Sequence, residues 1–239
     1  MKIGGLAKLS LLDYPGHLSA IIFTTGCNFR CRFCYNPMLV LPGRTIDKSQ
    51  APSPSEEELE AFLTARRGKL EAVVVTGGEP TIHADLPKFL AKIKKLGYLI
   101  KLDTNGTNPE MLADLLKNKL VDYLAMDLKA PTDKYEQVTG VKVDLNKIKK
   151  SVKLIIDSGL PYEFRTTVVK SLMSEADIKA MAEILRRADF WYLQKFEGNR
   201  DLVDAALVNE RPYTDQEMTA LAAAGATICP GCRYRQYYG

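Results

Sequence analysis

Three cysteines near the N-terminus are the residues whose types and spacing most clearly indicate chemistry. Cys27, Cys31 and Cys34 form a C-x3-C-x2-C run in a chain of 239 residues that contains five cysteines. Thiolates this close together suit an iron–sulfur cluster or zinc. Three ligands are one fewer than the four that saturate a [4Fe–4S] cluster or a structural zinc site. Because neither His17 nor His83 stands at a zinc-finger spacing, we expect a cluster with one iron open to an exogenous ligand.

The composition favours a cytoplasmic protein. The first ten residues lack the charged start and apolar run of a signal peptide. No stretch reaches the roughly 18 apolar residues of a membrane span. In the cytoplasm, clustered cysteines indicate metal or redox chemistry rather than disulfides. The 33 basic and 29 acidic residues are mixed along the chain, whereas nucleic-acid binding favours a concentrated basic face. We therefore expect neither a membrane nor a nucleic-acid partner.

The elements that must position the cysteines alternate between two kinds. Short β-branched runs predict strands at 18–24, 72–76, 98–103, 123–127, 162–169 and 190–195. Amphipathic patterns predict helices at 55–67, 86–96, 109–117, 146–158 and 175–187. This alternation is typical of βαβ units and a parallel sheet. With six units in place of the usual eight, we predict an α/β fold, a partial (β/α)6 TIM-like barrel.

The same patterns divide the chain. We expect residues 1–200 to form the core domain, and residues 201–239 to add a C-terminal helix and tail packed on that domain. The stretch 41–54 is rich in Pro, Ser and charge and predicts a loop. Ser55 followed by three glutamates predicts the capped start of a helix.

Polar and glycine-rich clusters stand at the carboxyl ends of nearly all the predicted strands. In strand order they are Gly26-Cys27, Gly77-Gly78-Glu79-Pro80, Asp103-Thr104-Asn105-Gly106, Asp127-Leu128-Lys129, Arg165, and Gln194-Lys195. Ligands of parallel α/β sheets bind at this edge. The sequence therefore predicts one large site there.

The cysteine run, with Phe33 before its last cysteine, resembles the signature of the radical S-adenosylmethionine (SAM) superfamily. The resemblance implies a [4Fe–4S] cluster on the three cysteines and SAM chelating the fourth iron. Gly77-Gly78-Glu79-Pro80 resembles the motif with which the family holds the SAM amino group. Glycines permit close backbone approach, and carbonyl and carboxylate oxygens accept hydrogen bonds from an ammonium group.

A narrower resemblance is to glycyl-radical-enzyme activases. It rests on the Asp-x-Pro-Gly segment at 13–16 and on Cys34-Tyr35-Asn36, and it covers roughly residues 9–195. The nearest likeness is to activating proteins of anaerobic ribonucleotide reductase, with similarity also to pyruvate formate-lyase activase. It implies reductive cleavage of SAM to a 5′-deoxyadenosyl radical that makes a glycyl radical on a partner enzyme. Anaerobic ribonucleotide reductase is the expected partner, and flavodoxin or ferredoxin the expected electron donor.

The activase resemblance also assigns SAM contacts. Asp127 is expected to bind the ribose and Lys129 the carboxylate. Asp103, Thr104 and Asn105 match positions that contact SAM, and a monovalent cation is expected near Asp103 and Asp127.

Two further positions bear on the cofactor. Tyr35 is expected to be among the cofactor-binding residues. Gln194 stands where the family can present a histidine to the ribose. A glutamine can still hydrogen-bond a hydroxyl group.

A second cysteine pair, Cys229-Pro230-Gly231-Cys232, lies near the C-terminus. A C-x2-C pair is half of a common metal site. It could pair with its copy in a dimer, form a labile disulfide, donate to a partner, or be two inert thiols. The basic, aromatic residues 233–238 suit a protein contact or a solvated end.

Two other functions remain open. The first is a radical SAM enzyme that acts on a small molecule, a peptide or a nucleotide. The second is an iron–sulfur electron carrier or a zinc-binding module, although carriers normally saturate every iron.

Overall fold

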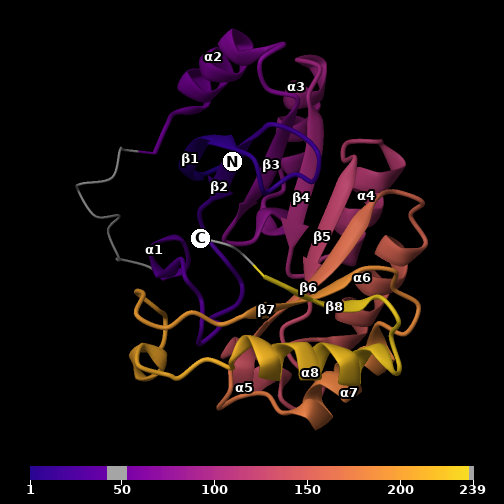
Figure 1. Ribbon diagram of the computed structural model, residues 1–239. Helices are drawn as coiled ribbons and strands as arrows, with labels where there is room; N and C mark the ends of the chain where they lie inside the picture. The colour runs from indigo at the N-terminus through magenta and orange to yellow at the C-terminus, as the bar shows by residue number, and fades with distance from the viewer. Residues whose placement is uncertain (42–52, 237–239) are drawn as a thin grey trace.

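A curved eight-stranded sheet forms the centre of the computed structural model, which describes residues 1–41 and 53–236 (Figure 1). The strands follow one another in chain order: β1 (Ile3–Ser10), β2 (Ser19–Thr24), β3 (Ala72–Gly77), β4 (Leu99–Thr104), β5 (Tyr123–Asp127), β6 (Tyr162–Val168), β7 (Trp191–Lys195) and β8 (Cys232–Arg235). Strands β2 to β8 are parallel, and β1 runs antiparallel to β2. The sheet is therefore open, with β1 and β8 at its two edges.

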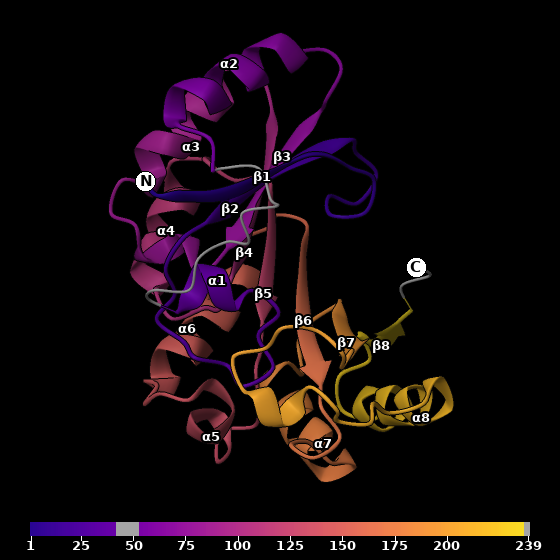
Figure 2. The same ribbon diagram turned by 90° about the vertical axis from the view of Figure 1, so that its left-hand side faces the viewer.

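Helices surround the sheet, and the longer ones lie along its outer side (Figures 1 and 2). They are α1 (Pro37–Val40), α2 (Glu56–Arg66), α3 (Leu86–Lys95), α4 (Pro109–Lys117), α5 (Tyr135–Thr139), α6 (Leu145–Ile156), α7 (Glu175–Ile184) and α8 (Asp215–Ala226), with 3-10 turns η1 (Pro80–Ile82) and η2 (Ala205–Leu207). The predicted helix start at Ser55 is confirmed, because Ser55 and Glu58 form a reciprocal capping box. No helix within the described ranges is long and apolar enough to cross a membrane.

The predicted α/β partial barrel is confirmed, and the structure adds two edge strands, β1 and β8, that were not predicted. Of the predicted loop at 41–54, residues 42–52 lie outside the described ranges, as do residues 237–239 of the tail. Residues 233–235 belong to β8. Part of the basic, aromatic segment is thus a strand of the sheet rather than a solvated end.

The two faces of the sheet bury different side chains, because successive strand residues point to opposite sides. On β3, Val73 and Val75 join the large core under the helices. Ala72 and Val74 join a small apolar cluster with Tyr14. That small cluster fills the amino-terminal end of the concave face, which leaves the carboxyl-terminal end for polar residues.

The second cysteine pair is part of the core. Cys229 and Cys232 are free, buried thiols. The Cys229 sulfur lies 3.5 Å from the carbonyl oxygen of Ala188. A Cβ atom placed on Gly225 would lie 2.7 Å from the Cys232 sulfur. The pair is therefore closely packed at the junction of α8 and β8.

Candidate active site

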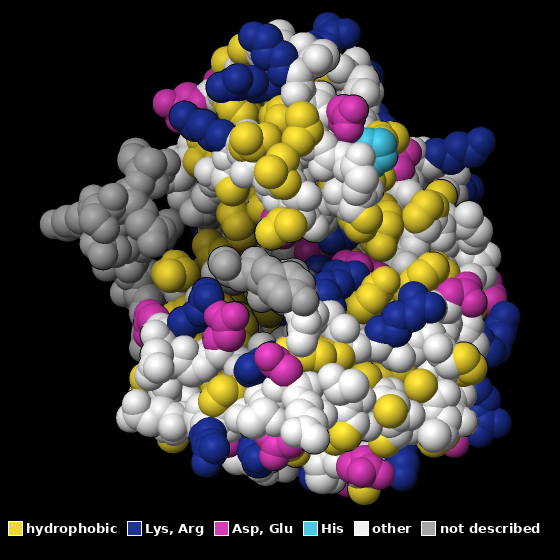
Figure 3. Space-filling view, in the orientation of Figure 1, with side chains coloured by type: hydrophobic (Ala, Val, Ile, Leu, Met, Phe, Trp, Pro, Cys, Tyr) yellow, Lys and Arg dark blue, Asp and Glu magenta, His cyan; other side chains and the backbone are white. Residues whose placement is uncertain are grey.

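A cavity of about 660 Å³ opens at the carboxyl ends of β2 to β7. All of the predicted site residues line it: Cys27, Cys31, Cys34, Tyr35, Gly77, Gly78, Glu79, Asp103, Thr104, Asn105, Asp127, Lys129 and Gln194. Figure 3 shows a hollow on this face, with basic and acidic side chains inside it. The structure brings the residues together, and their individual roles toward a cofactor stay predictions.

The two glycines pack backbone against backbone on the segment that leads to the first cysteine. The Gly78 amide donates to the Thr24 carbonyl at 2.9 Å, and the Glu79 amide donates to the Gly26 carbonyl at 2.8 Å. A Cβ atom on Gly78 would stand 1.9 Å from the Gly26 oxygen. The close approach that these glycines permit is therefore between two segments of the chain, and it fixes where Cys27 begins the cysteine loop.

Glu79 anchors the neighbouring strand ends. It is buried, and one carboxylate oxygen accepts from the Thr81 amide at 3.1 Å, the Thr81 hydroxyl at 2.5 Å and the Thr104 hydroxyl at 2.7 Å. The other oxygen accepts from the Asn105 amide at 2.6 Å. Burial raises the pKa of Glu79, and these hydrogen bonds oppose the rise. Only the second oxygen keeps capacity for a further donor such as an ammonium group.

A ring of amide and hydroxyl groups connects β4 to the cysteine loop. The side-chain nitrogen of Asn105, Nδ2, donates to Asn28 Oδ1 at 2.8 Å, and Asn28 Nδ2 donates to Thr107 Oγ1 at 2.8 Å. The Thr107 hydroxyl closes the ring on Asn105 Oδ1 at 2.7 Å. Asn105 therefore holds the loop between Cys27 and Cys31 in place, a contact that the sequence did not reveal.

On the concave face, Arg165 bridges the carboxylates of Asp103 and Asp127, the two acidic residues expected to lie at the SAM site. Its Nε donates to Asp127 Oδ1 at 2.8 Å, and its Nη1 donates to Asp103 Oδ2 at 3.0 Å. Lys129 Nζ donates to Asp127 Oδ2 at 2.9 Å. Burial alone would raise the pKa of Asp127, but Arg165 and Lys129 outweigh burial and hold it well below its usual range. Asp127 is therefore ionised and fixed in orientation.

Asp103 has the less satisfied carboxylate of the two. Its Oδ1 is buried and makes no hydrogen bond within the described part of the chain, although Lys101 Nζ lies 3.4 Å away. This oxygen could accept from a ligand or bind a cation. Arg165 was noted on the rim from the sequence but was given no role. The signal for Arg165 in the sequence is a second charged residue, two positions after Glu163, on a short strand.

The cysteine thiols are buried beside a lysine. Burial raises the pKa of Cys27 to about 11 and that of Cys31 to about 12, and it also raises that of Cys34. The ammonium group of Lys129, 6.0 Å from the centre of the Phe33 ring, opposes all three shifts. Cluster ligands must lose their protons. Lys129 therefore favours the ligand form of the thiols.

The donor set fits a cluster better than a single ion. Among residues 1–41 and 53–236, no three His, Cys, Asp or Glu side chains are grouped to hold one metal ion. A [4Fe–4S] cluster binds each cysteine at a different iron, so its three ligands stand apart around it. Three thiols that line a cavity of this size, without converging on one point, match that requirement.

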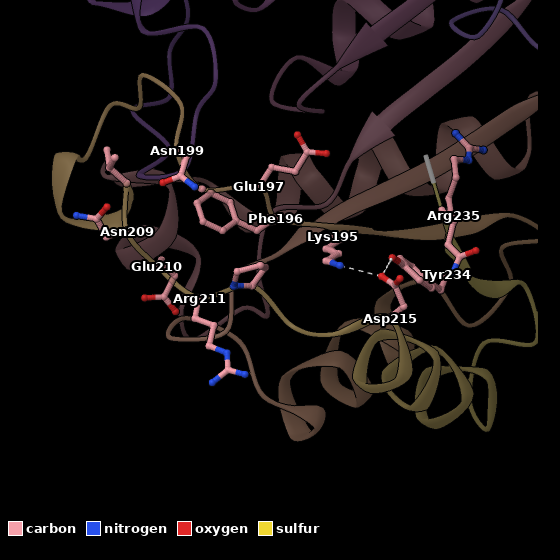
Figure 4. A pocket seen from close by; sticks show the side chains of 14 residues that line it. Lys195, Phe196, Glu197, Asn199, Asn209, Glu210, Arg211, Asp215, Tyr234 and Arg235 are labelled. Carbon is pink, nitrogen blue, oxygen red and sulfur yellow. Dashed lines mark hydrogen bonds and ion pairs between the residues drawn. The ribbon is translucent and has the colours of Figure 1, made fainter. Parts of the chain in front are cut away.

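A second cavity, of about 630 Å³, lies next to the first, and Lys195 and Glu197 line both. Figure 4 shows it between the segment after β7, the start of α8, and β8. Lys195 Nζ and the Tyr234 hydroxyl each lie 2.8 Å from Asp215 Oδ1. The Tyr35 hydroxyl accepts from the Glu197 amide at 2.8 Å. Tyr35 thus connects the cysteine loop to the segment that separates the two cavities.

Comparison with known proteins agrees with this geometry. A model of the radical SAM superfamily matches residues 21–188. A Methanocaldococcus jannaschii protein provisionally named a glycyl-radical enzyme activating enzyme is 36% identical over 203 residues, which are 82% of this chain and 80% of that protein. A provisionally named GTP 3′,8-cyclase from Pyrococcus horikoshii is 26% identical over 179 residues, 74% of this chain. The match spans 51% of the cyclase, about half its length.

Solved structures share the fold. The crystal structure of Streptococcus suis SuiB superposes with a TM-score of 0.60 at 16% sequence identity. The superposition covers 87% of this chain and 44% of SuiB. At that identity the likeness concerns the fold alone.

Proposed function

The chain belongs to the radical SAM superfamily, and from that premise we propose that it is a glycyl-radical-enzyme activase. The proposed substrate is a backbone glycine of a partner enzyme, and the proposed partner is anaerobic ribonucleotide reductase. The relative at 36% identity, which matches over most of both chains, supports the activase class. A low-potential flavodoxin or ferredoxin is the proposed donor, and the cytoplasm the proposed compartment.

The observation that carries this proposal is that a second cavity adjoins the first, with Lys195 and Glu197 lining both. A cluster and SAM would fill the first cavity, next to the cysteines. The second then remains for substrate, and it extends away from the cofactors along the edge strand β8. A cavity beside the cofactors leaves room for a segment of a partner protein.

The residues of the chain have the following proposed roles. Cys27, Cys31 and Cys34 would hold the cluster, and Glu79, with the glycines before it, would receive the SAM amino group. Asp127 would bind the ribose in the orientation that Arg165 fixes, and Gln194 would add a hydrogen bond. Thr104 and Asn105 keep the β4 end of the cavity in place. Lys129 would pair with the SAM carboxylate, and Tyr35 would close the side toward the second cavity.

When bound and reduced, the cluster with SAM supplies a 5′-deoxyadenosyl radical able to abstract a hydrogen atom from a glycine. The chain contributes orientation and exclusion of water. We also propose a monovalent cation near Asp103 and Asp127, because Asp103 Oδ1 is a buried carboxylate oxygen that makes no hydrogen bond within the described residues. Lys101 Nζ lies 3.4 Å from Asp103 Oδ1 and Arg165 Nη1 lies 3.0 Å from Asp103 Oδ2, so the cation would bind beside these two positive groups.

Electron paramagnetic resonance tests the function. The anaerobically reconstituted protein is mixed with SAM, a reductant and the purified reductase, and we expect a glycyl radical signal on the reductase. A reductase whose radical-bearing glycine is replaced by alanine should give none, and neither should the Cys31→Ala activase. SAM cleavage without any glycyl radical would refute the activase proposal.

A radical SAM enzyme acting on a small molecule, peptide or nucleotide is the second candidate. The observation that favours it is the similarity to proteins named GTP 3′,8-cyclases. SAM cleavage that is stimulated by GTP, with transfer of substrate hydrogen into 5′-deoxyadenosine, would support this candidate over the first.

A further inference from the structure

Three large apolar side chains at the end of β1 and in the turn that follows it face solvent. Leu9, Leu11 and Leu12 are 60%, 68% and 75% exposed, the most exposed large apolar residues of the described chain. Leu18, on the other side of the turn, is 41% exposed. Figure 3 shows hydrophobic side chains gathered on this face above the hollow. An apolar patch of this kind on a polar surface marks an interaction site.

The turn that presents these leucines is rigid. The amides of Leu12 and Asp13 both donate to the Ser10 hydroxyl oxygen at 3.1 Å, and Ser10 hydrogen-bonds the Asp13 carboxylate. Lys101 Nζ donates to the Asp13 carbonyl at 2.7 Å. Tyr14 is buried in the small apolar cluster under the sheet. These contacts hold the backbone of the turn in the conformation that presents the leucines to solvent.

The turn also borders the active site. Leu12 and Asp13 line the same cavity as the three cysteines. The turn follows β1, the edge strand opposite β8 across the open side of the sheet. A macromolecule that reaches the cavity from this side must pass over the leucines.

We propose that Leu9, Leu11 and Leu12 form the docking surface for the protein substrate, and that they bind an apolar face beside its glycine-bearing loop. This inference rests on the proposed activase function. A glycine has no side chain to be recognised, so selection of the correct glycine must come from contacts outside the reacting residue. The leucine turn offers such contacts at the mouth of the cavity. Because it is preformed, docking costs little ordering entropy.

A double variant of the two leucines that do not line the cavity tests the proposal. Leu9→Gln/Leu11→Gln keeps side-chain size and removes the apolar surface, and Leu9→Met/Leu11→Met is the matched control that keeps it. Binding to each glycyl-radical enzyme encoded in the same genome is titrated anaerobically, and SAM cleavage is measured without partner. We expect the Gln variant to bind the glycyl-radical enzyme roughly tenfold more weakly or worse, because it loses two leucines that the partner would partly bury in the complex. Its SAM cleavage should equal that of wild type, and the Met variant should bind normally.

The other outcomes are separable. If wild type makes a glycyl radical and the Gln variant binds as tightly as wild type, the docking proposal fails alone. If wild type makes no glycyl radical on any of these enzymes, the activase function fails and the docking proposal with it. Two other results would overturn the proposal. Wild type could form a dimer, or it could bind phosphatidylglycerol vesicles, and the Gln variant could lose that property while it still binds the partner enzyme normally.

Discussion

Gly78→Ala is expected to displace the start of the cysteine loop. A Cβ atom at Gly78 would lie 1.9 Å from the Gly26 carbonyl oxygen, whereas real Cβ atoms essentially never approach within 3.0 Å. One segment must therefore move by about an ångström, and the obstacle is backbone, which cannot rotate away. The shift also breaks the 2.8 Å hydrogen bond between the Glu79 amide and that carbonyl. Overpacking costs about 1–3 kcal/mol, and an unsatisfied buried polar group costs about 1–3 kcal/mol. We therefore expect the free energy of unfolding to fall by roughly 2–6 kcal/mol.

The matched control is Gly5→Ala on β1. Its Cβ atom would meet only the Phe23 side chain, at 3.6 Å, which is ordinary contact. Neither Gly5 nor Gly78 has a left-handed backbone, so strain of the alanine backbone does not distinguish the two substitutions. The free energy of unfolding of both apo variants is measured in urea, and iron per chain is measured after reconstitution.

We expect Gly5→Ala to resemble wild type in both measurements, and Gly78→Ala to lose stability and cluster. Cluster loss should exceed what the unfolded fraction explains, because the displaced Gly26 carbonyl belongs to the residue before Cys27. If Gly78→Ala bound four irons and unfolded like Gly5→Ala, the backbone contact would not position the loop, and the reasoning would be wrong.

Three further predictions concern other parts of the molecule. Arg165→Met should lower the free energy of unfolding by about 1.5–3 kcal/mol at pH 7, because it removes charge-assisted hydrogen bonds from the partly buried carboxylates of Asp103 and Asp127. Since the folded pKa of Asp127 is depressed, its contribution is present above the unfolded pKa of about 3.9 and is lost as the pH falls below it. The difference in urea stability between wild type and variant should therefore narrow below about pH 4, and an equal difference at pH 7 and pH 3 would contradict this. Cys229→Ala/Cys232→Ala should lower stability but keep about four irons per chain; loss of iron without unfolding would assign metal to the pair. Replacing K⁺ and Na⁺ by tetramethylammonium should weaken SAM binding by wild type but not by Asp103→Asn, as measured by calorimetry.

The central strands could be predicted from sequence, and the edge strands could not, for a physical reason. Strands such as β3, with its run of valines, are buried on both faces and carry their own apolar signal. β1 contains two glycines, and β8 has only four residues, two of them arginines. β8 is stabilised by contacts from distant residues, because Arg235 pairs with Glu163 and lies 3.6 Å above the Tyr192 ring. Such pairings leave no local pattern.

The site could be located from sequence for a different reason. Parallel strands place all their carboxyl ends at one edge, so clusters far apart in the chain were expected to meet, and they line one cavity. The sequence could not predict which groups each of these residues contacts by hydrogen bonds. Glu79 was expected to serve a ligand, and its carboxylate is largely taken up by Thr81, Thr104 and Asn105. Hydrogen-bond partners depend on the exact approach of loops, which spacing alone does not fix.

The charges of the concave face are best explained by a ligand rather than by stability. Lys101 and Glu163 are almost completely buried, and their charged atoms lie 3.4 Å apart. Replacing a buried ion pair with well-packed apolar residues is often neutral or stabilising, so such a network is not needed to hold the sheet together. It does fix the carboxylates of Asp103 and Asp127 and the ammonium group of Lys129 along one wall of the cavity, through Arg165. A wall with fixed charges of both signs is complementary to a ligand that itself carries both, as SAM does in its ammonium, sulfonium and carboxylate groups. If that is its purpose, Arg165→Met should weaken SAM binding by more than its loss of stability accounts for, whereas a purely structural network would leave the affinity of the folded fraction unchanged.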